Sequence, residues 1–147
     1  MMKTKLRIWI NTMIGVILGL FGIGCFSCGM YGVPTGDLAF RCNVADEANK
    51  PLKGKQVVRY GGWKDGAGTM YWNYWADTLY TDAEGNAYHL YKGRDPMTLH
   101  KVIVNDTTGE YQSDSAIYEV KYKGGHGAWN KGKAVLETKF TLRKKGE

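Results

Sequence analysis

Apolar and polar side chains alternate along short segments of the chain from residue 37 onward, and this period of two is typical of half-buried β-strands. Residues 38–44 and 136–142 show the alternation most clearly. In the first segment Cys42 falls on the apolar side, so we expect a buried, inert thiol. Further β-rich runs lie between these two segments: residues 56–60, 71–80, 87–91, 99–104 and 116–122.

Clusters of Gly, Pro, Asn and Asp separate these runs and predict the turns. The turn signals fall at residues 48–51, 82–86, 95–96, 106–109 and 123–125. No segment after residue 37 sustains the 3.6-residue apolar period of a helix. Seven short strands at this spacing predict one all-β domain over residues 37–147, folded as an Ig-like antiparallel sandwich.

The first 27 residues have the order of an export signal. Lys3, Lys5 and Arg7 give a positively charged start, and residues 13–23 follow as an uncharged apolar run of signal-peptide length. We therefore expect residues 1–27 to form the helix of a signal peptide ahead of the sandwich. Two cysteines end this segment, in the string Gly24-Cys25-Phe26-Ser27-Cys28.

A cysteine directly after a cleavage site resembles the lipobox of bacterial lipoproteins, in which that cysteine carries the lipid. Cys28, preceded by a serine, is favoured, because residues 28–36 would then be a polar tether to the domain. Cys25, preceded by a glycine, is the alternative. Two further alternatives are an uncleaved membrane helix over residues 8–26 and a redox pair formed by the two cysteines. Signal and membrane helix both place the body outside the cytoplasm.

The net charge of +6 does not indicate a nucleic-acid partner. Removing the three basic residues of the N-terminal signal from the 20 leaves 17, against 14 acidic residues. The remaining charges are interspersed, and only residues 143–145 form a basic cluster. A nucleic-acid-binding surface needs a basic stripe with stacking aromatics, and the sequence lacks one.

Two sequence strings resemble a known domain family. The first runs from Val44 to Gly54 and ends in Pro-Leu-Lys-Gly; the second is Thr81-Asp-Ala-Glu-Gly-Asn86. Both are similar to turns of carboxypeptidase-regulatory-like, transthyretin-like domains. The resemblance implies a transthyretin-like β-sandwich.

A narrower resemblance covers nearly the whole chain. The Ser27-Cys28 signal end, the string 30–35 and the strings 77–82 and 106–114 occur in the order found in a family of lipoproteins of Bacteroides-like bacteria. That family is named for neighbouring radical SAM enzymes. The resemblance implies a seven-strand sandwich and a lipid anchor in the cell envelope, but no established activity.

Tyr and Trp concentrate in the middle of the chain and suggest a ligand surface. On an extended strand Trp72 and Tyr74 share one side and Tyr71 and Trp75 the other, so some of these rings must be exposed. Exposed rings can stack on sugars, which makes Trp63, Trp72 and Tyr74 candidate glycan-binding residues. The alternative is ordinary packing, since aromatic residues also favour strands.

No motif indicates catalysis, a metal or another cofactor. The three histidines have no metal-ligand spacing, residues 82–86 lack the closing Glu of a calcium loop, and no Gly-x-Ser-x-Gly elbow occurs. We therefore expect a lipoprotein that is not an enzyme, anchored in a bacterial envelope with its body in the periplasm or at the cell surface. Its partner is expected to be an envelope protein, or alternatively a glycan.

Overall fold

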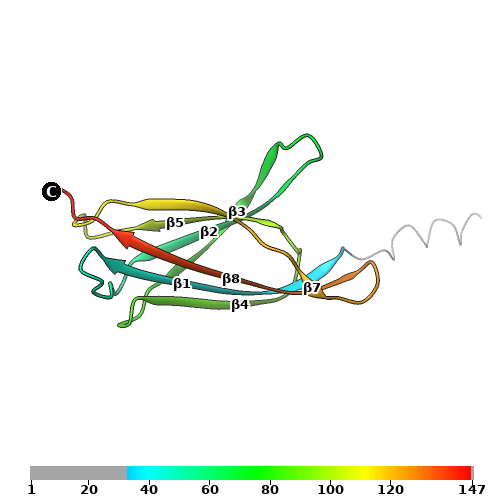
Figure 1. The fold of residues 1–147 in the computed structure, drawn as a ribbon, viewed down its shortest axis with the longest axis horizontal. Coiled ribbons are helices and arrows are strands. Elements are labelled where there is room, and N and C mark those ends of the chain that lie inside the picture. Colours follow the sequence, from blue (N-terminus) through cyan, green and yellow to red (C-terminus); the bar gives the residue numbers. More distant parts are fainter. Residues whose placement is uncertain (1–32, 147) are drawn as a thin grey trace, which may run out of the picture. The chain divides into compact units, whose positions relative to one another are not determined.

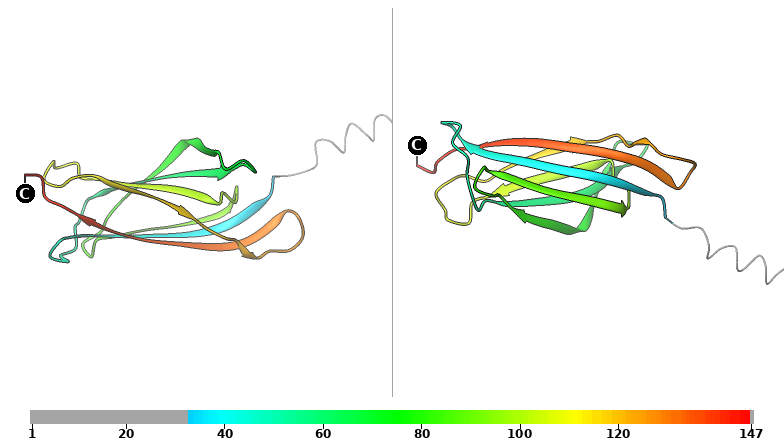
Figure 2. Two further views of the ribbon diagram at one scale, coloured as in Figure 1. Left: turned by 45° about the horizontal axis from the view of Figure 1, so that its top comes forward. Right: turned by 90° about the horizontal axis from the view of Figure 1, so that it is seen from below.

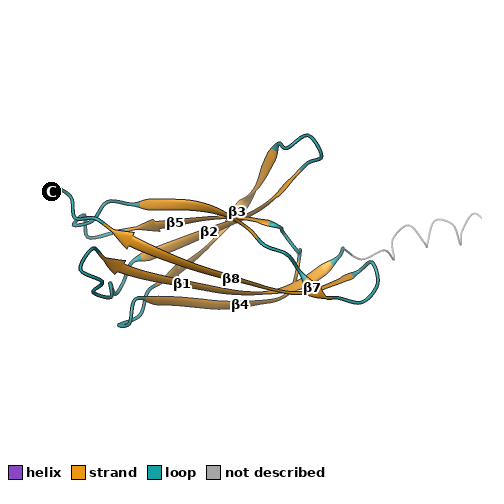
Figure 3. Ribbon diagram, viewed as in Figure 1, coloured by secondary structure: helices purple, strands orange, loops and turns teal. Residues whose placement is uncertain are grey.

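The computed structural model describes residues 33–146, and these form eight β-strands and no helix (Figure 3). The strands are β1 (Thr35–Asp46), β2 (Gln56–Lys64), β3 (Met70–Tyr80), β4 (Asn86–Arg94), β5 (Leu99–Asn105), β6 (Asp114–Glu119), β7 (Lys123–Gly124) and β8 (Asn130–Leu142). No helix in this part of the chain is long and apolar enough to cross a membrane. The predicted signal peptide, with Cys25 and Cys28, lies outside the described residues.

The strands form two four-stranded sheets that lie face to face (Figures 1 and 2). One sheet has the order β4-β1-β8-β7 and the other β3-β2-β5-β6. The chain therefore crosses between the sheets several times, and each sheet mixes early and late strands. All seven predicted strands occur, which confirms the all-β prediction with two sheets; β1 begins at Thr35, just before the predicted domain start at residue 37.

The predicted strand count and the fully antiparallel pairing are both wrong in detail. The eighth strand, β7, falls where the sequence predicts a turn, and it pairs Lys123 with Lys133 and Gly124 with Gly132. Two residues are too few to show an alternating pattern. In addition, β1 and β8 pair in parallel. An alternating pattern says which side of a strand is buried, but it does not specify the direction of its neighbour.

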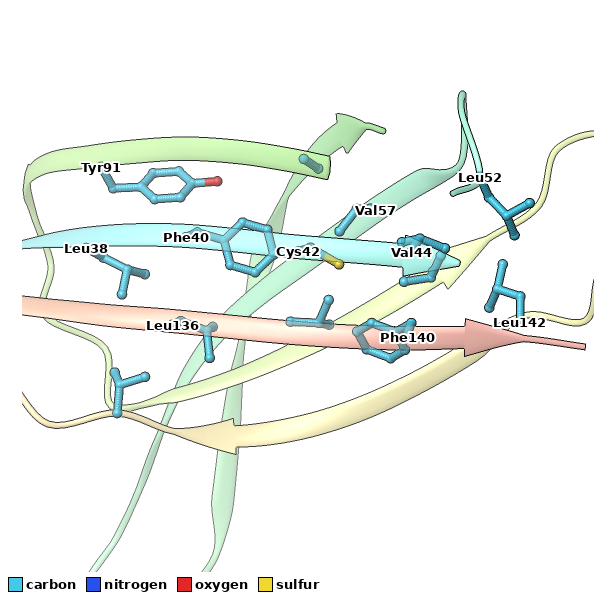
Figure 4. Close-up of a cluster of buried hydrophobic side chains, with 14 of the residues drawn as sticks. Leu38, Phe40, Cys42, Val44, Leu52, Val57, Tyr91, Leu136, Phe140 and Leu142 are labelled. Carbon is cyan, nitrogen blue, oxygen red and sulfur yellow. The ribbon is translucent and has the colours of Figure 1, made fainter. Parts of the chain in front are cut away.

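The core lies between the two sheets, where the alternating residues of β1 and β8 meet Val57, Val102 and Val104 of the second sheet. The parallel register places Phe40 beside Leu136 and Val44 beside Phe140, so the apolar sides of both strands face the second sheet (Figure 4). Cys42 belongs to this cluster and is a free thiol, which confirms its predicted burial. Burial raises the pKa of this thiol to about 11, so it stays protonated and unreactive at neutral pH.

A buried ion pair joins the residue before β2 to the turn after β5. Lys55 Nζ lies 2.6 Å from Asp106 Oδ1, and the two side chains are only 6% and 1% exposed. Asp106 also accepts hydrogen bonds from the backbone N–H groups of Thr108 and Tyr111. Burial alone would raise the pKa of Asp106, but the bonds from Lys55 and from these donors outweigh it and hold the pKa well below its usual range.

The β2–β3 hairpin extends beyond the two layers (Figure 1). Along most of their length the strands pair regularly, from Gln56 opposite Tyr80 to Tyr60 opposite Ala76. The register then shifts, and pairing resumes with Gly62 opposite Trp72. The extra residues of β3 at this irregularity bend the hairpin away from the sandwich, and this leaves its aromatic side chains without a covering layer.

Candidate functional site

A cleft of about 500 Å³ lies where β3 and β4, the edge strands of the two sheets, run on the same side of the sandwich. Its lining comes from β1, β2, β3, β4, β5, the loop before β5 and the segment between β6 and β7, which contributes Tyr122. This volume falls within the roughly 300–1,000 Å³ usual for ligand pockets. Charged and polar side chains supply much of this lining.

Arg59 is the centre of this polar lining. It occupies an inward position of β2, between the buried Val57 and Gly61, where the pattern of the strand would place an apolar residue. Its Nη2 donates to Asp77 Oδ2 at 2.6 Å, and its Nη1 lies 2.9 Å from Nδ1 of His100. Asp77 stands directly opposite Arg59 on β3, so the sheet register itself brings the two charges together.

His100 is buried next to Arg59 and is held in one tautomer. Its Nε2 lies 3.0 Å from the carbonyl oxygen of Met97 and donates to it, which leaves Nδ1 to accept from Arg59. Burial, and then the charge of Arg59, lower the pKa of His100 to about 4. The ring is therefore neutral at pH 7, and both nitrogens are already bonded. It supports Arg59 and is not available as a base.

Two buried donors in the cleft lining lack a hydrogen-bond partner among the described residues: Nε of Arg59 and the hydroxyl of Tyr91. The guanidinium of Arg59 lies over the Tyr91 ring, 4.1 Å from its centre. Burial raises the pKa of Tyr91, so its hydroxyl keeps its proton. Buried polar groups are normally satisfied by protein, water or ligand, so these two donors mark where a water or ligand oxygen would bond in the cleft.

The mouth of the cleft holds an aromatic ring beside the charged groups. Trp75 lines the cleft although 84% of its surface is exposed. Asn73, on the same strand, reaches inward, and its Nδ2 lies 4.0 Å from the sulfur of Met97. Met97 packs directly against the backbone of Gly61. A Cβ at residue 61 would overlap the Met97 sulfur, so glycine leaves room for this side chain. Lys92, Arg94 and Asp95 line the cleft on the β4 side.

The predicted glycan-binding residues lie on the β2–β3 hairpin and do not form one surface. Trp63 stacks on Tyr71, with ring centres 5.7 Å apart and 15° between the planes. Trp72 follows Tyr71 in the strand and so lies on the opposite side, half-buried over Gly62. Tyr74 is 98% exposed. A role for Trp63, Trp72 and Tyr74 in binding stays a prediction.

The turn at residues 82–86 stabilises itself. Asp82 Oδ1 accepts hydrogen bonds from the backbone N–H groups of Glu84 and Asn86, so this carboxylate caps the turn. Within residues 33–146 no three His, Cys, Asp or Glu side chains are grouped as metal ligands would be.

The sequence pattern does not reveal the charged and polar residues of the cleft, which are Arg59, Asp77, His100 and Tyr91. The one available signal was an arginine at an inward position of a strand, flanked by Val57 and Gly61. A buried arginine requires partners, but β3, β4 and β5 supply them, and their pairing is not visible in the pattern of β2. The alternation of β3 places Trp75 on the opposite side from Tyr74, which agrees with its position in the cleft lining.

No protein-family model matches the chain, and no curated protein matches its sequence. Among solved structures, catechol 1,2-dioxygenase from Pseudomonas arvilla C-1 is similar in fold, with a TM-score of 0.53 at 12% identity over 80% of this chain. The 3-chlorocatechol 1,2-dioxygenase from Rhodococcus opacus 1CP gives a TM-score of 0.49 at 14% identity over 74% of the chain. The chain spans 55% and 60% of these two proteins. At such identities the likeness shows the fold alone.

Proposed function

We propose that this chain is a membrane-anchored binding module of a bacterial cell envelope and that it recognises a partner without catalysing a reaction. In this proposal Cys28 carries the lipid, with Cys25 as the alternative, and a transthyretin-like body lies outside the cytoplasm. The order of the N-terminal segments and the resemblance to the radical SAM-associated lipoprotein family support it.

The observation that carries the binding proposal is the exposure of large aromatic side chains along the β2–β3 hairpin. Tyr74 is 98% exposed, Trp75 84% and Trp63 51%, while the core of the sandwich is complete without them. So many large exposed rings on one hairpin are uncommon on a protein that has no partner, and we take them to mark a contact surface. Aromatic residues are also enriched where partners are bound.

The chemistry of the buried reactive groups supports a module without catalysis. The thiol of Cys42 is inside the core with a raised pKa, so it is a poor nucleophile. The His100 ring has both nitrogens bonded to protein atoms and stays neutral. A general base needs a free nitrogen within reach of a substrate proton, and this histidine does not offer one.

The anchor is tested by the intact mass of the protein purified from its native host. Cleavage before Cys28 together with a diacyl or triacyl increment is the expected result. A mass that corresponds to cleavage before Cys25 would select the alternative cysteine. The mass of the uncleaved chain would contradict the lipoprotein proposal and indicate a membrane helix instead.

The contact surface is tested by photo-crosslinking in the native envelope. A photoreactive phenylalanine analogue replaces Tyr74, and the matched control replaces Val135, which is 61% exposed on β8. We expect a discrete crosslinked adduct from residue 74 and none from residue 135. Equal labelling at both positions, or no adduct at either, would count against a partner at the hairpin.

A carbohydrate-binding module is the second candidate. The stacked pair of Trp63 and Tyr71 favours it, because the electron-rich face of an aromatic ring attracts the weakly positive C–H face of a sugar. Soluble glycans should then change the tryptophan fluorescence of the chain. Trp129, on the β7–β8 hairpin, provides the control, since its replacement by Ala should leave glycan binding unchanged. An unchanged spectrum across a glycan panel would remove this candidate.

A further inference from the structure

We propose that the cleft between β3 and β4 is a subsite for a single uncharged sugar ring, which stacks on Trp75 and donates hydroxyl hydrogen bonds to Asp77. This inference rests on the carbohydrate-binding candidate above. It moves the centre of that activity from the stacked pair of Trp63 and Tyr71 to the mouth of the cleft.

Trp75 has the position required of a stacking ring. It lines the cleft and is 84% exposed, so a large apolar face meets solvent beside polar groups. Such a ring would be covered by neighbouring side chains if its role were to fill the core. The ligand that matches it has one apolar face and a polar edge, which is the surface of a pyranose ring.

Asp77 supplies an oriented acceptor next to this ring. Its Oδ2 is bonded to Arg59 at 2.6 Å, and 51% of the side chain remains exposed. Arg59 is itself fixed by His100 and by the Tyr91 ring. The carboxylate is therefore held in place before a ligand arrives, which lowers the entropy lost on binding. A hydroxyl group that donates to a carboxylate forms a charge-assisted hydrogen bond.

The charges of the lining favour an uncharged ligand. Arg59, Lys92 and Arg94 bring positive charge, and Asp77 and Asp95 bring negative charge, on the walls of one cleft. A carboxylate or phosphate ligand would face the half-exposed Asp77, and a cationic ligand would face the arginines. A polyhydroxylated ligand can donate to the acids and accept from the bases at once.

The unpartnered donors inside the cleft also point to a ligand rich in oxygen. Nε of Arg59 and the hydroxyl of Tyr91 are buried, and neither has a hydrogen-bond partner among the described residues. An oxygen acceptor that enters the cleft, either a sugar hydroxyl or a water that the sugar holds in place, satisfies such groups. An apolar ligand would leave them unsatisfied.

The test is fluorine NMR of the full chain with 5-fluorotryptophan at its tryptophans. The Trp75 resonance is assigned from a Trp75→Phe variant. The probes are the methyl glycosides of glucose, galactose, mannose and N-acetylglucosamine, each added to millimolar concentration. We expect at least one glycoside to shift the Trp75 resonance and to leave the Trp63 and Trp129 resonances in place.

Variants then separate the cleft from the hairpin. Trp75→Ala and Asp77→Asn should each weaken binding by about tenfold or more, a loss of about 1.4 kcal/mol. Asn retains an oxygen that accepts from Arg59, and circular dichroism verifies the fold of each variant. Trp63→Ala should leave the affinity within about twofold, which is under 0.5 kcal/mol.

The outcomes distinguish this inference from the proposal on which it rests. If a glycoside shifts Trp63 and not Trp75, and Trp63→Ala abolishes binding, the chain is a carbohydrate-binding module but the cleft is not its site. If no glycoside shifts any tryptophan, both the cleft subsite and the carbohydrate-binding candidate are overturned. Equal losses in the Trp75 and Trp63 variants would likewise overturn a subsite confined to the cleft.

Discussion

Acidification from pH 7 to pH 5 adds a proton to the His100 ring in the unfolded chain but not in the folded protein. The folded ring is 1% exposed, and its Nδ1 accepts from Arg59, so a proton there would replace a hydrogen bond with a repulsive contact between two cations. The folded pKa of His100 is about 4, and an unfolded histidine has a pKa of about 6.5. Between these two values the unfolded chain binds more protons, so stability falls as the pH falls.

The size of this effect follows from the two pKa values. Each unit of pKa difference corresponds to about 1.4 kcal/mol. The full loss, reached below the folded pKa of about 4, is therefore about 3 kcal/mol. At pH 5 the same two values give a loss of about 2 kcal/mol relative to pH 7. That is a substantial part of the roughly 5–15 kcal/mol by which a native domain is usually stable.

Urea unfolding of the full chain, monitored by tryptophan fluorescence between pH 7 and pH 5, measures this loss. His100→Gln is the test variant, because an amide can accept from Arg59 and donate to Met97 but does not titrate. We expect it to be less stable than the natural protein at pH 7 and to lack the 2 kcal/mol decline. His89→Gln is the control; His89 is exposed on β4, so this variant should keep the decline.

Parallel stability curves for the natural protein and His100→Gln between pH 7 and pH 5 would refute the reasoning. They would mean that the buried ring titrates as it does in the unfolded chain and that it is not bonded to Arg59. Asp106 does not obscure the comparison, because its lowered pKa makes its contribution disappear only at more acidic pH, and equally in both proteins.

Further substitutions, at the buried ion pair and at two glycines, test the packing of the sandwich by urea unfolding. Lys55→Met leaves the Asp106 carboxylate buried without its partner and should cost about 3–5 kcal/mol. The double variant Lys55→Met/Asp106→Asn should regain part of this loss, because the Asn oxygen is neutral and still accepts a backbone bond from Thr108 or Tyr111; strictly additive losses would argue against a coupled pair. Gly132→Ala places a methyl group against the Lys123 carbonyl at φ 88° and should cost well over 2 kcal/mol. Gly93→Ala is the control, because residue 93 has φ 59° and open space around it, and it should lower the free energy of unfolding by only about 1–2 kcal/mol. Equal losses of stability in the two variants would contradict the packing of β7 on β8.

The sequence predicts the buried side of the longest strands because their burial depends on local alternation. In β1 the buried residues Leu38, Phe40, Cys42 and Val44 are those that the period of two selects, and β8 behaves in the same way. Both strands have sheet neighbours over much of their length, so one side must face the second sheet and the pattern is enforced at every position.

The cleft could not be predicted in this way, because its residues come together only through pairing between distant strands. Arg59 and Asp77 meet across the β2–β3 register, and His100 comes from β5 on the other side of β2. Alternation in β2 alone identifies residue 59 as inward, and a buried arginine then contradicts the usual preference for apolar side chains there. Alternation also leaves open which of the hairpin aromatics are exposed. Their exposure depends on the register shift after Tyr60, which no short motif records.

The parallel pairing of β1 and β8 determines how the body would respond to mechanical load. Thr35 and Asn130 lie at one end of this pair, and Asp46 and Leu142 at the other. A pull between the start of β1 and the end of β8 therefore acts along both strands in opposite directions and strains the hydrogen bonds between them together. Hydrogen bonds loaded in this shearing direction share the force. When paired strands are instead peeled apart from one end, the hydrogen bonds between them break one at a time. A domain tethered near Thr35 and pulled from its C-terminus would thus resist tension through the two strands that also form its core.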